Sequence, residues 1–289
     1  MIARIALYCA AAGACVALMG MGEHVALSLL SGAAIGASFV PVARYGPRGF
    51  VGQFIATITV LLTVGTVCSV LEAVVFLPEA RTNALRLLVT GVGVNLLLAT
   101  VLATLATKMK LTVTEPADFP MLRGPFSAAG MVPLCGLLYL IYFLVFGSIA
   151  LIFVKKYYVH VLQPGPWFFP YEIGRGVLMT LALVPIIGTL RLPRGRAAFA
   201  VGVLLWIVGG GAALLLPNPY MVAPQRYIHI AEIMAENVLL GMTAVFLLRR
   251  PHGLDKEGAG ATPHAYVRNS RTSSSCAAGA VEAKGTLAP

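Results

Sequence analysis

Three ionisable side chains share one face of the last apolar segment of the chain. His229, Glu232 and Glu236 are spaced i, i+3 and i+7, and at about 100° per residue this spacing puts all three within about 60° of one another on a helix. Asn237 lies on the flank of this stripe. An ionisable side chain within a membrane span costs about 2.5–3.5 kcal/mol even on a lenient insertion scale, so the stripe is expected to face a bundle interior or a wet cavity. We therefore predict a ligand-binding or proton-binding site that includes these four residues.

Two further apolar segments carry charge. Glu72 lies in the segment 50–77. Glu172 and Arg175 are spaced i, i+3 at the start of another segment, close enough to pair on one helix surface. We interpret them as a structural ion pair that fixes which helices meet. For Glu72 and the 229–236 stripe, a structural network and a binding site remain equally open, because three carboxylates outnumber the nearby cations and buried net charge requires a proton, a metal or a ligand.

Other chemistries have less support in the sequence. His229 and Glu232 are spaced so that they can place two metal ligands on one face, but no second motif of this kind accompanies them. We predict no cofactor and no metal site, and His229 with Glu232 are the ligands if a metal is bound. A haem held between two histidines needs a second histidine within a span. The chain has no nucleophile elbow, phosphate loop, nucleotide fingerprint or His-Glu-x-x-His motif.

The composition indicates that lipid, and not water, is the main solvent of the chain. Of 289 residues, 58% are hydrophobic and 11% are charged, whereas soluble domains carry about 25% charged residues. Apolar stretches long enough to cross a hydrocarbon layer of about 30 Å follow one another from Met1 to Leu248. The alternation of barrel strands is absent, and lipid does not tolerate unpaired backbone groups. The predicted fold class is therefore an all-α, polytopic transmembrane helix bundle.

The predicted transmembrane domain covers residues 1–248 and has about eight spans. The spans are expected at 3–21, 25–42, 50–77, 85–107, 128–154, 171–190, 197–216 and 227–248. The first span is expected to stay uncleaved as the first helix of a hairpin, because the next apolar segment begins at Val25. Residues 249–289 are polar and rich in small residues, and they are predicted to form a disordered cytoplasmic tail.

Small and polar residues within the spans are interpreted as packing residues. Gly32 and Gly36, and the run 209–211, let helix backbones approach closely, which we favour over a hinge or a broken helix. Asn95 is expected to make a packing hydrogen bond. Four of the five cysteines lie in apolar segments without a C-x-x-C pair, so neither a disulfide framework nor a zinc site is implied.

The orientation in the membrane follows from the Lys and Arg residues near the span ends. With the N-terminus in the cytoplasm, twelve lie in inner loops and five in outer loops. The inner residues are Arg4, Arg44, Arg48, Lys108, Lys110, Arg123, Arg191, Arg194, Arg196, Arg249, Arg250 and Lys256, and the outer residues are Arg81, Arg86, Lys155, Lys156 and Arg226. We therefore predict a protein of the plasma membrane (the bacterial inner membrane) with both termini in the cytoplasm, although the Lys155–Lys156 pair opposes this locally.

This topology brings the charged segments to one depth. The third span ends outside and the sixth and eighth begin outside, so their ionisable residues lie within roughly two turns of the outer boundary. These residues are Glu72, Glu172, Arg175, His229 and Glu232, with Glu236 nearer the midplane. The net charge of +10 is spread through short loops and the tail, which the positive-inside rule explains more economically than nucleic-acid binding.

Part of the chain resembles a pattern in bacterial multi-pass membrane proteins that have no established activity. The residues that carry the resemblance are Pro217 to Met221, Arg226, His229, Glu232, Asn237, Gly241 and Leu71-Glu72-Ala73. The resemblance implies a membrane location and brings no catalytic assignment. It favours Glu72 and the helix that contains His229 as the residues to test.

Three functions are compatible with the sequence. The first is a non-enzymatic protein in the lipid bilayer that binds or transports a small polar solute, a proton or a cation at the outer polar residues. The second is a metal-assisted intramembrane or interfacial enzyme that acts on a lipid-linked substrate. The third is a structural subunit of a membrane complex. The sequence leans away from an enzyme and leaves substrate and protein partners unspecified.

Overall fold

The computed structural model describes residues 1–19, 24–76, 78–113, 122–157, 165, 167–217 and 221–250, with the side chains of 78–80 left aside. They belong to one compact unit, Met1–Pro251, and the predicted tail beyond it lies outside the described residues. The ordered elements of the described part are helical: α1 Ile2–Met19, α2 Val25–Tyr45, α3 Gly49–Leu62, η1 Thr63–Cys68, α4 Ser69–Phe76, α5 Pro78–Lys108, α6 Pro125–Val154, η2 Lys155–Tyr157, α7 Phe168–Ile187, α8 Arg194–Trp206, η3 Ile207–Gly211, η4 Ala213–Leu215 and α9 Ala223–Leu248.

The all-α membrane fold predicted from the sequence is confirmed. Seven helical segments of the described chain are long and apolar enough to cross a membrane. They correspond to every predicted span except 197–216. One boundary differs clearly, because α5 begins at Pro78, seven residues before the predicted 85. Residues 78–84 include polar residues, which lower the hydropathy of the segment and so shortened the predicted span. The segment is helical nevertheless, because polar residues do not by themselves end a helix.

The predicted span 197–216 is an interrupted helix. The α-helix α8 continues into the π-helical turn η3, in which Gly210 has a φ of +149°. Only glycine adopts this conformation readily. The hydroxyl of Ser31 in α2 donates a hydrogen bond to the Ala212 carbonyl at 2.9 Å, satisfying a backbone group beyond the break. The expectation that the glycine run serves packing and not a break is therefore wrong at Gly210, although Gly209 does lie against Asn237.

The third span is continuous but contains a second π-helical segment. Between α3 and α4 the chain forms η1, where the helix is wider than an α-helix and its hydrogen bonds shift by one residue. The Asn95 amide on α5 donates to the Leu61 carbonyl at 3.0 Å and to the Thr66 hydroxyl at 2.6 Å. The packing hydrogen bond expected for Asn95 is present, and it stabilises the irregular segment. The two irregular segments, η1 and η3, also contact each other.

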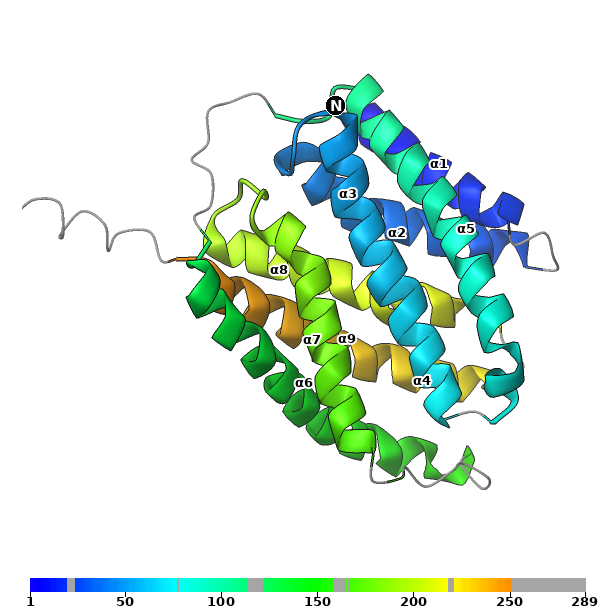
Figure 1. The fold of residues 1–289 in the computed structure, drawn as a ribbon. Helices are drawn as coiled ribbons and strands as arrows, with labels where there is room; N and C mark the ends of the chain where they lie inside the picture. Colours follow the sequence, from blue (N-terminus) through cyan, green and yellow to red (C-terminus); the bar gives the residue numbers. More distant parts are fainter. Residues whose placement is uncertain are drawn as a thin grey trace, which may run out of the picture. The chain divides into compact units, whose positions relative to one another are not determined.

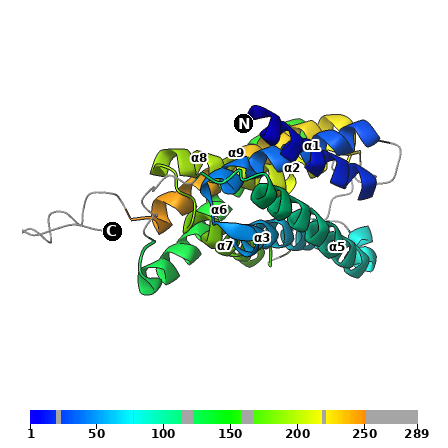
Figure 2. The same ribbon diagram turned by 90° about the horizontal axis from the view of Figure 1, so that it is seen from above.

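Helix α7 is central to the bundle. Figures 1 and 2 show α1, α2, α8 and α9 on one side, with α3, α5 and α7 on the other. Neighbours in contact include α1 with α2, α8 with α9, α3 with α5, and α6 with both α7 and α9. Helix α7 contacts α3, η1, α6 and α9. It therefore lies where the charged residues of the third and last spans can meet.

Glycines set the closest helix crossings. A Cβ atom at Gly32 would lie 2.5 Å from the Ala12 carbonyl oxygen, so α1 and α2 approach backbone to backbone as the Gly32-x-x-x-Gly36 motif predicts. A Cβ at Gly176 in α7 would lie 2.6 Å from the Cβ of Tyr139 in α6. These contacts fix the rotation of α7 against α6 and hence the side chains that α7 presents to its neighbours.

Arg249 lies at the end of the bundle where α7 ends and α8 begins. The guanidinium is 3% exposed and donates hydrogen bonds to the carbonyls of Ile187, Leu190 and Leu192 at 2.7–3.1 Å. Burial, with a smaller contribution from the charge of Arg194, lowers the pKa of Arg249 to about 10. Arg249, predicted as the first residue of the tail, thus belongs to the helical unit.

Candidate functional site

Arg175 joins two carboxylates from different helices. Its Nη2 donates to Oε2 of Glu72 in α4 at 2.6 Å, and its Nη1 lies 3.6 Å from Oε2 of Glu172 in α7. The Arg175 and Glu172 side chains are 3% and 0% exposed, whereas Glu72 is 34% exposed. The local pair predicted from the sequence exists, but the shorter contact goes to Glu72, which the sequence analysis had grouped with the last helix instead.

Tyr139 of α6 completes the surroundings of this arginine. The Arg175 guanidinium lies 5.7 Å from the centre of the Tyr139 ring, within the range of a cation–π contact. Tyr139 is fully buried, and its hydroxyl has no hydrogen-bond partner among the described residues. Tyr139 was not predicted as a site residue, because it lies in an apolar segment without charge. The nearby Gly136, which together with Gly176 permits the α6–α7 crossing, is the only local signal.

The polar stripe of α9 turns toward α6 and α7. Nδ1 of His229 and Oε2 of Glu232 are 2.5 Å apart. The other oxygen of Glu232 lies 3.1 Å from the position that a Cβ on Gly147 of α6 would take, so this glycine leaves room for the carboxylate. One turn further on, Asn237 is 1% exposed, and its amide donates to the Leu205 carbonyl at 3.4 Å.

Glu236 connects the stripe with the arginine. Its side chain is 2% exposed, and Oε1 is enclosed without a hydrogen-bond partner in the described part of the chain. It is near enough to interact electrostatically with Glu232 of α9, with Arg175 and Glu172 of α7 and with Glu72 of α4. Glu236 therefore links the charged residues of these three helices, whereas the predicted site residue Asn237 lies apart from them, against α8 and η3.

We call this group the acidic cluster. It consists of Glu72, Glu172, Glu232, Glu236, Arg175, His229 and Tyr139. Four carboxylates stand against one guanidinium and at most one imidazolium, which leaves at least two negative charges when all four are ionised. Such a balance is costly in a membrane interior, where each unpaired charge is poorly solvated. A proton or a cation bound to the cluster lowers this negative charge.

The chain matches no protein-family model, no curated protein and no solved structure. The resemblance to bacterial multi-pass proteins stays a prediction.

The candidate metal ligands form no complete site in the described residues. His229 and Glu232 supply two donor side chains from one helix, and no described group of three or more His, Cys, Asp or Glu side chains is arranged to hold a metal ion. A catalytic zinc site uses three protein ligands. No observation in the described part specifically favours the metal-assisted enzyme considered from the sequence.

Proposed function

We propose that the acidic cluster binds protons, and that the protein couples this binding to the movement of a small polar solute or cation across the membrane. The proposal depends on one observation: the buried carboxylate of Glu236 has an enclosed oxygen without a partner in the described chain and has other carboxylates as neighbours. Protonation removes the buried charge and converts the group into a hydrogen-bond donor. It is the smallest change that lowers the negative charge of the cluster.

Tyr139 supports a path for the proton. Its hydroxyl can both donate and accept, and it is near enough to Glu236 and Arg175 to interact electrostatically with both. Glu72, which is partly exposed, and Glu232 flank this buried centre from two different helices. Protons thus have one partly exposed carboxylate, Glu72, at the edge of the cluster and a buried one, Glu236, within it, the arrangement found in proton relays of membrane pumps and transporters.

We further propose that the protein lies in the bacterial plasma membrane with both termini in the cytoplasm. The excess of Lys and Arg in the loops assigned to the inside supports this orientation. The cluster then lies in the outer half of the bilayer, so that protons enter it from the outer side.

Infrared spectroscopy of the purified protein tests proton binding directly. At neutral pH the wild-type protein is expected to show the carbonyl stretch of a protonated carboxylic acid, and Glu236→Gln is expected to lose it. Glu282→Gln removes the same type of group from outside the helical unit and is expected to keep the band. Identical spectra for wild type and Glu236→Gln would overturn the proposal and favour a permanently ionised, structural network.

Vesicles with a trapped pH-sensitive dye test whether protons also move. Under an imposed membrane potential, wild-type vesicles are expected to acidify faster than Glu236→Gln vesicles by at least about tenfold, a difference that corresponds to about 1.4 kcal/mol in barrier height. Glu282→Gln serves again as the control. If wild type and Glu236→Gln acidify at one rate while the infrared band differs, the cluster binds a proton without conducting it, and transport has to be sought through exchange with a solute.

A further inference from the structure

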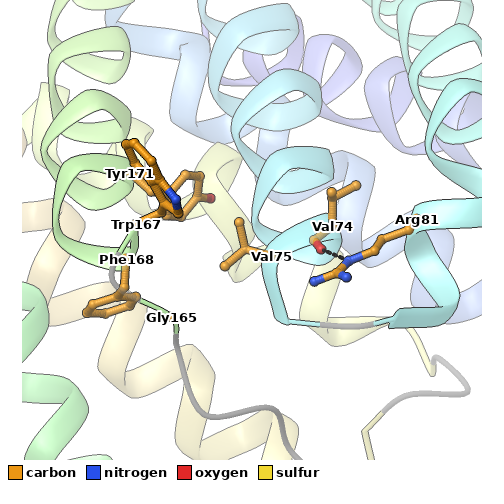
Figure 3. Close-up of a pocket in the computed structure, with 7 residues that line it drawn as sticks. All are labelled: Val74, Val75, Arg81, Gly165, Trp167, Phe168 and Tyr171. Carbon is orange, nitrogen blue, oxygen red and sulfur yellow. Dashed lines mark hydrogen bonds between the residues drawn. The ribbon is translucent and has the colours of Figure 1, made fainter.

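A second candidate site lies beside the acidic cluster, between the end of α4 and the beginning of α7. It is a cavity of about 340 Å³, within the size range of small-molecule sites. The residues that define its character are Val74, Val75, Arg81, Trp167, Phe168 and Tyr171. Figure 3 shows the aromatic side chains on the α7 side and Arg81 on the α5 side, with the two valines between them.

The walls of the cavity are apolar and aromatic. Val74 and Val75 line it from α4, and Phe168, which is 9% exposed, lines it from α7 as part of an aromatic group with Phe76 and Phe143. Trp167 is 79% exposed at the same level. Tryptophan and tyrosine at the end of a span are typical of the boundary between lipid tails and headgroups. An acyl chain fits such walls because it loses no hydrogen bonds there.

The charge of the cavity comes from Arg81. Its Nε donates to the Val74 carbonyl at 3.0 Å, which holds the guanidinium against the lining of the cavity. The nearest carboxylate of α4, Glu72, is already bound to Arg175. The cavity therefore combines an apolar interior with a cation at its edge, and it is complementary to an amphiphile with a negatively charged headgroup.

We propose that this cavity binds a membrane lipid with an acidic headgroup, whose phosphate contacts Arg81 and whose acyl chain lies against Val75 and Phe168. The apolar lining and the position at the boundary level support a lipid over a soluble phosphate compound, because most of the lining offers no polar contact to a soluble anion. The proposal does not depend on proton binding at Glu236. It adds a recognition site to the protein.

Fluorescence quenching by brominated lipids tests the site. The chain has two tryptophans, so Trp206→Phe leaves Trp167 as the reporter at the cavity. In bilayers with equal fractions of phosphatidylglycerol and phosphatidylcholine, bromination of the phosphatidylglycerol is expected to quench Trp167 more strongly, with a preference of about fivefold in apparent affinity for one added cation. Arg81→Gln is expected to abolish the preference, and Arg86→Gln, an exposed arginine of the same helix, is expected to keep it.

Native mass spectrometry of the otherwise unchanged protein gives a second readout that does not require Trp206→Phe to fold. One retained phosphatidylglycerol on wild type and Arg86→Gln, but none on Arg81→Gln, supports the proposal. Equal retention of both lipids by wild type, or a preference that survives Arg81→Gln, overturns it. Displacement of the lipid by soluble glycerol 1-phosphate would show that the site takes a soluble anion, which also overturns it.

Discussion

Replacing Arg175 by glutamine is expected to destabilise the bundle strongly, because it leaves a fully enclosed carboxylate without its cation. Glu172 is 0% exposed and lies 3.6 Å from the guanidinium, so water cannot take over the role of the arginine. Removing one partner of a buried ion pair costs about 3–5 kcal/mol. The bond to Glu72 is expected to contribute less although it is shorter, because Glu72 is 34% exposed and Glu172 is fully enclosed.

The same reasoning predicts the order of stability of related variants. Glu72→Gln is expected to cost less than Arg175→Gln, because Arg175 keeps Glu172 as its partner. The double variant Glu172→Gln/Arg175→Gln removes both buried charges together and is expected to recover about 1–3 kcal/mol relative to Arg175→Gln alone, as contacting residues do in double-mutant cycles. Arg86→Gln changes an exposed arginine and is expected to stay within about 0.5 kcal/mol of wild type.

The free energy of unfolding can be measured by titrating the protein in mixed micelles with sodium dodecyl sulfate, while circular dichroism follows helix content. The expected order of stability is wild type and Arg86→Gln, then Glu72→Gln, then the double variant, then Arg175→Gln. An Arg175→Gln protein as stable as Arg86→Gln would refute the reasoning. So would a double variant no more stable than Arg175→Gln, because Glu172 would then carry no charge that needs compensation.

Two further predictions concern the packing that holds the cluster in place. Gly176→Ala is expected to destabilise the protein by about 1–3 kcal/mol, because its Cβ would lie 2.6 Å from the Cβ of Tyr139, whereas Gly174→Ala in the same helix meets open space and is expected to be neutral in the same titration. Asn95→Ala removes two hydrogen bonds to the third span and is expected to cost about 1–3 kcal/mol. Thr100→Val, which removes a bond within one exposed turn, should change the unfolding midpoint little, and equal effects of the two variants would contradict the role given to Asn95.

Hydropathy and breaker residues predicted most of the fold. The span ends agree with the helices because proline and glycine lie between the apolar runs, and only the start of α5 and the break at Gly210 differ clearly. Hydropathy averages over a window and does not register a change in hydrogen-bond pattern within an apolar run. The π-helical segments η1 and η3 were therefore missed, although three consecutive glycines at 209–211 were a visible signal for one of them.

Most residues of the candidate site were predicted from the sequence, but most contacts between them were not. Helical periodicity placed His229, Glu232 and Glu236 on one face, because the spacing within one helix depends only on helix geometry. The partner of Arg175 on α4 depends on how two helices distant in the sequence are rotated against each other, which periodicity within one helix does not determine. The other residues were selected because an ionisable side chain is costly within a membrane span. Tyr139 carries no charge, so it was not selected in this way.

The π-helical segment η1 lies between α3 and the turn that carries Glu72. One residue corresponds to about 100° of rotation around an α-helix axis. If residues 63–68 formed an α-helix instead, the Glu72 side chain would therefore point roughly a quarter of a turn further around the third span, away from Arg175. The direction in which Glu72 points, and with it the bond to Arg175, therefore depends on the irregular segment that precedes α4 in the chain.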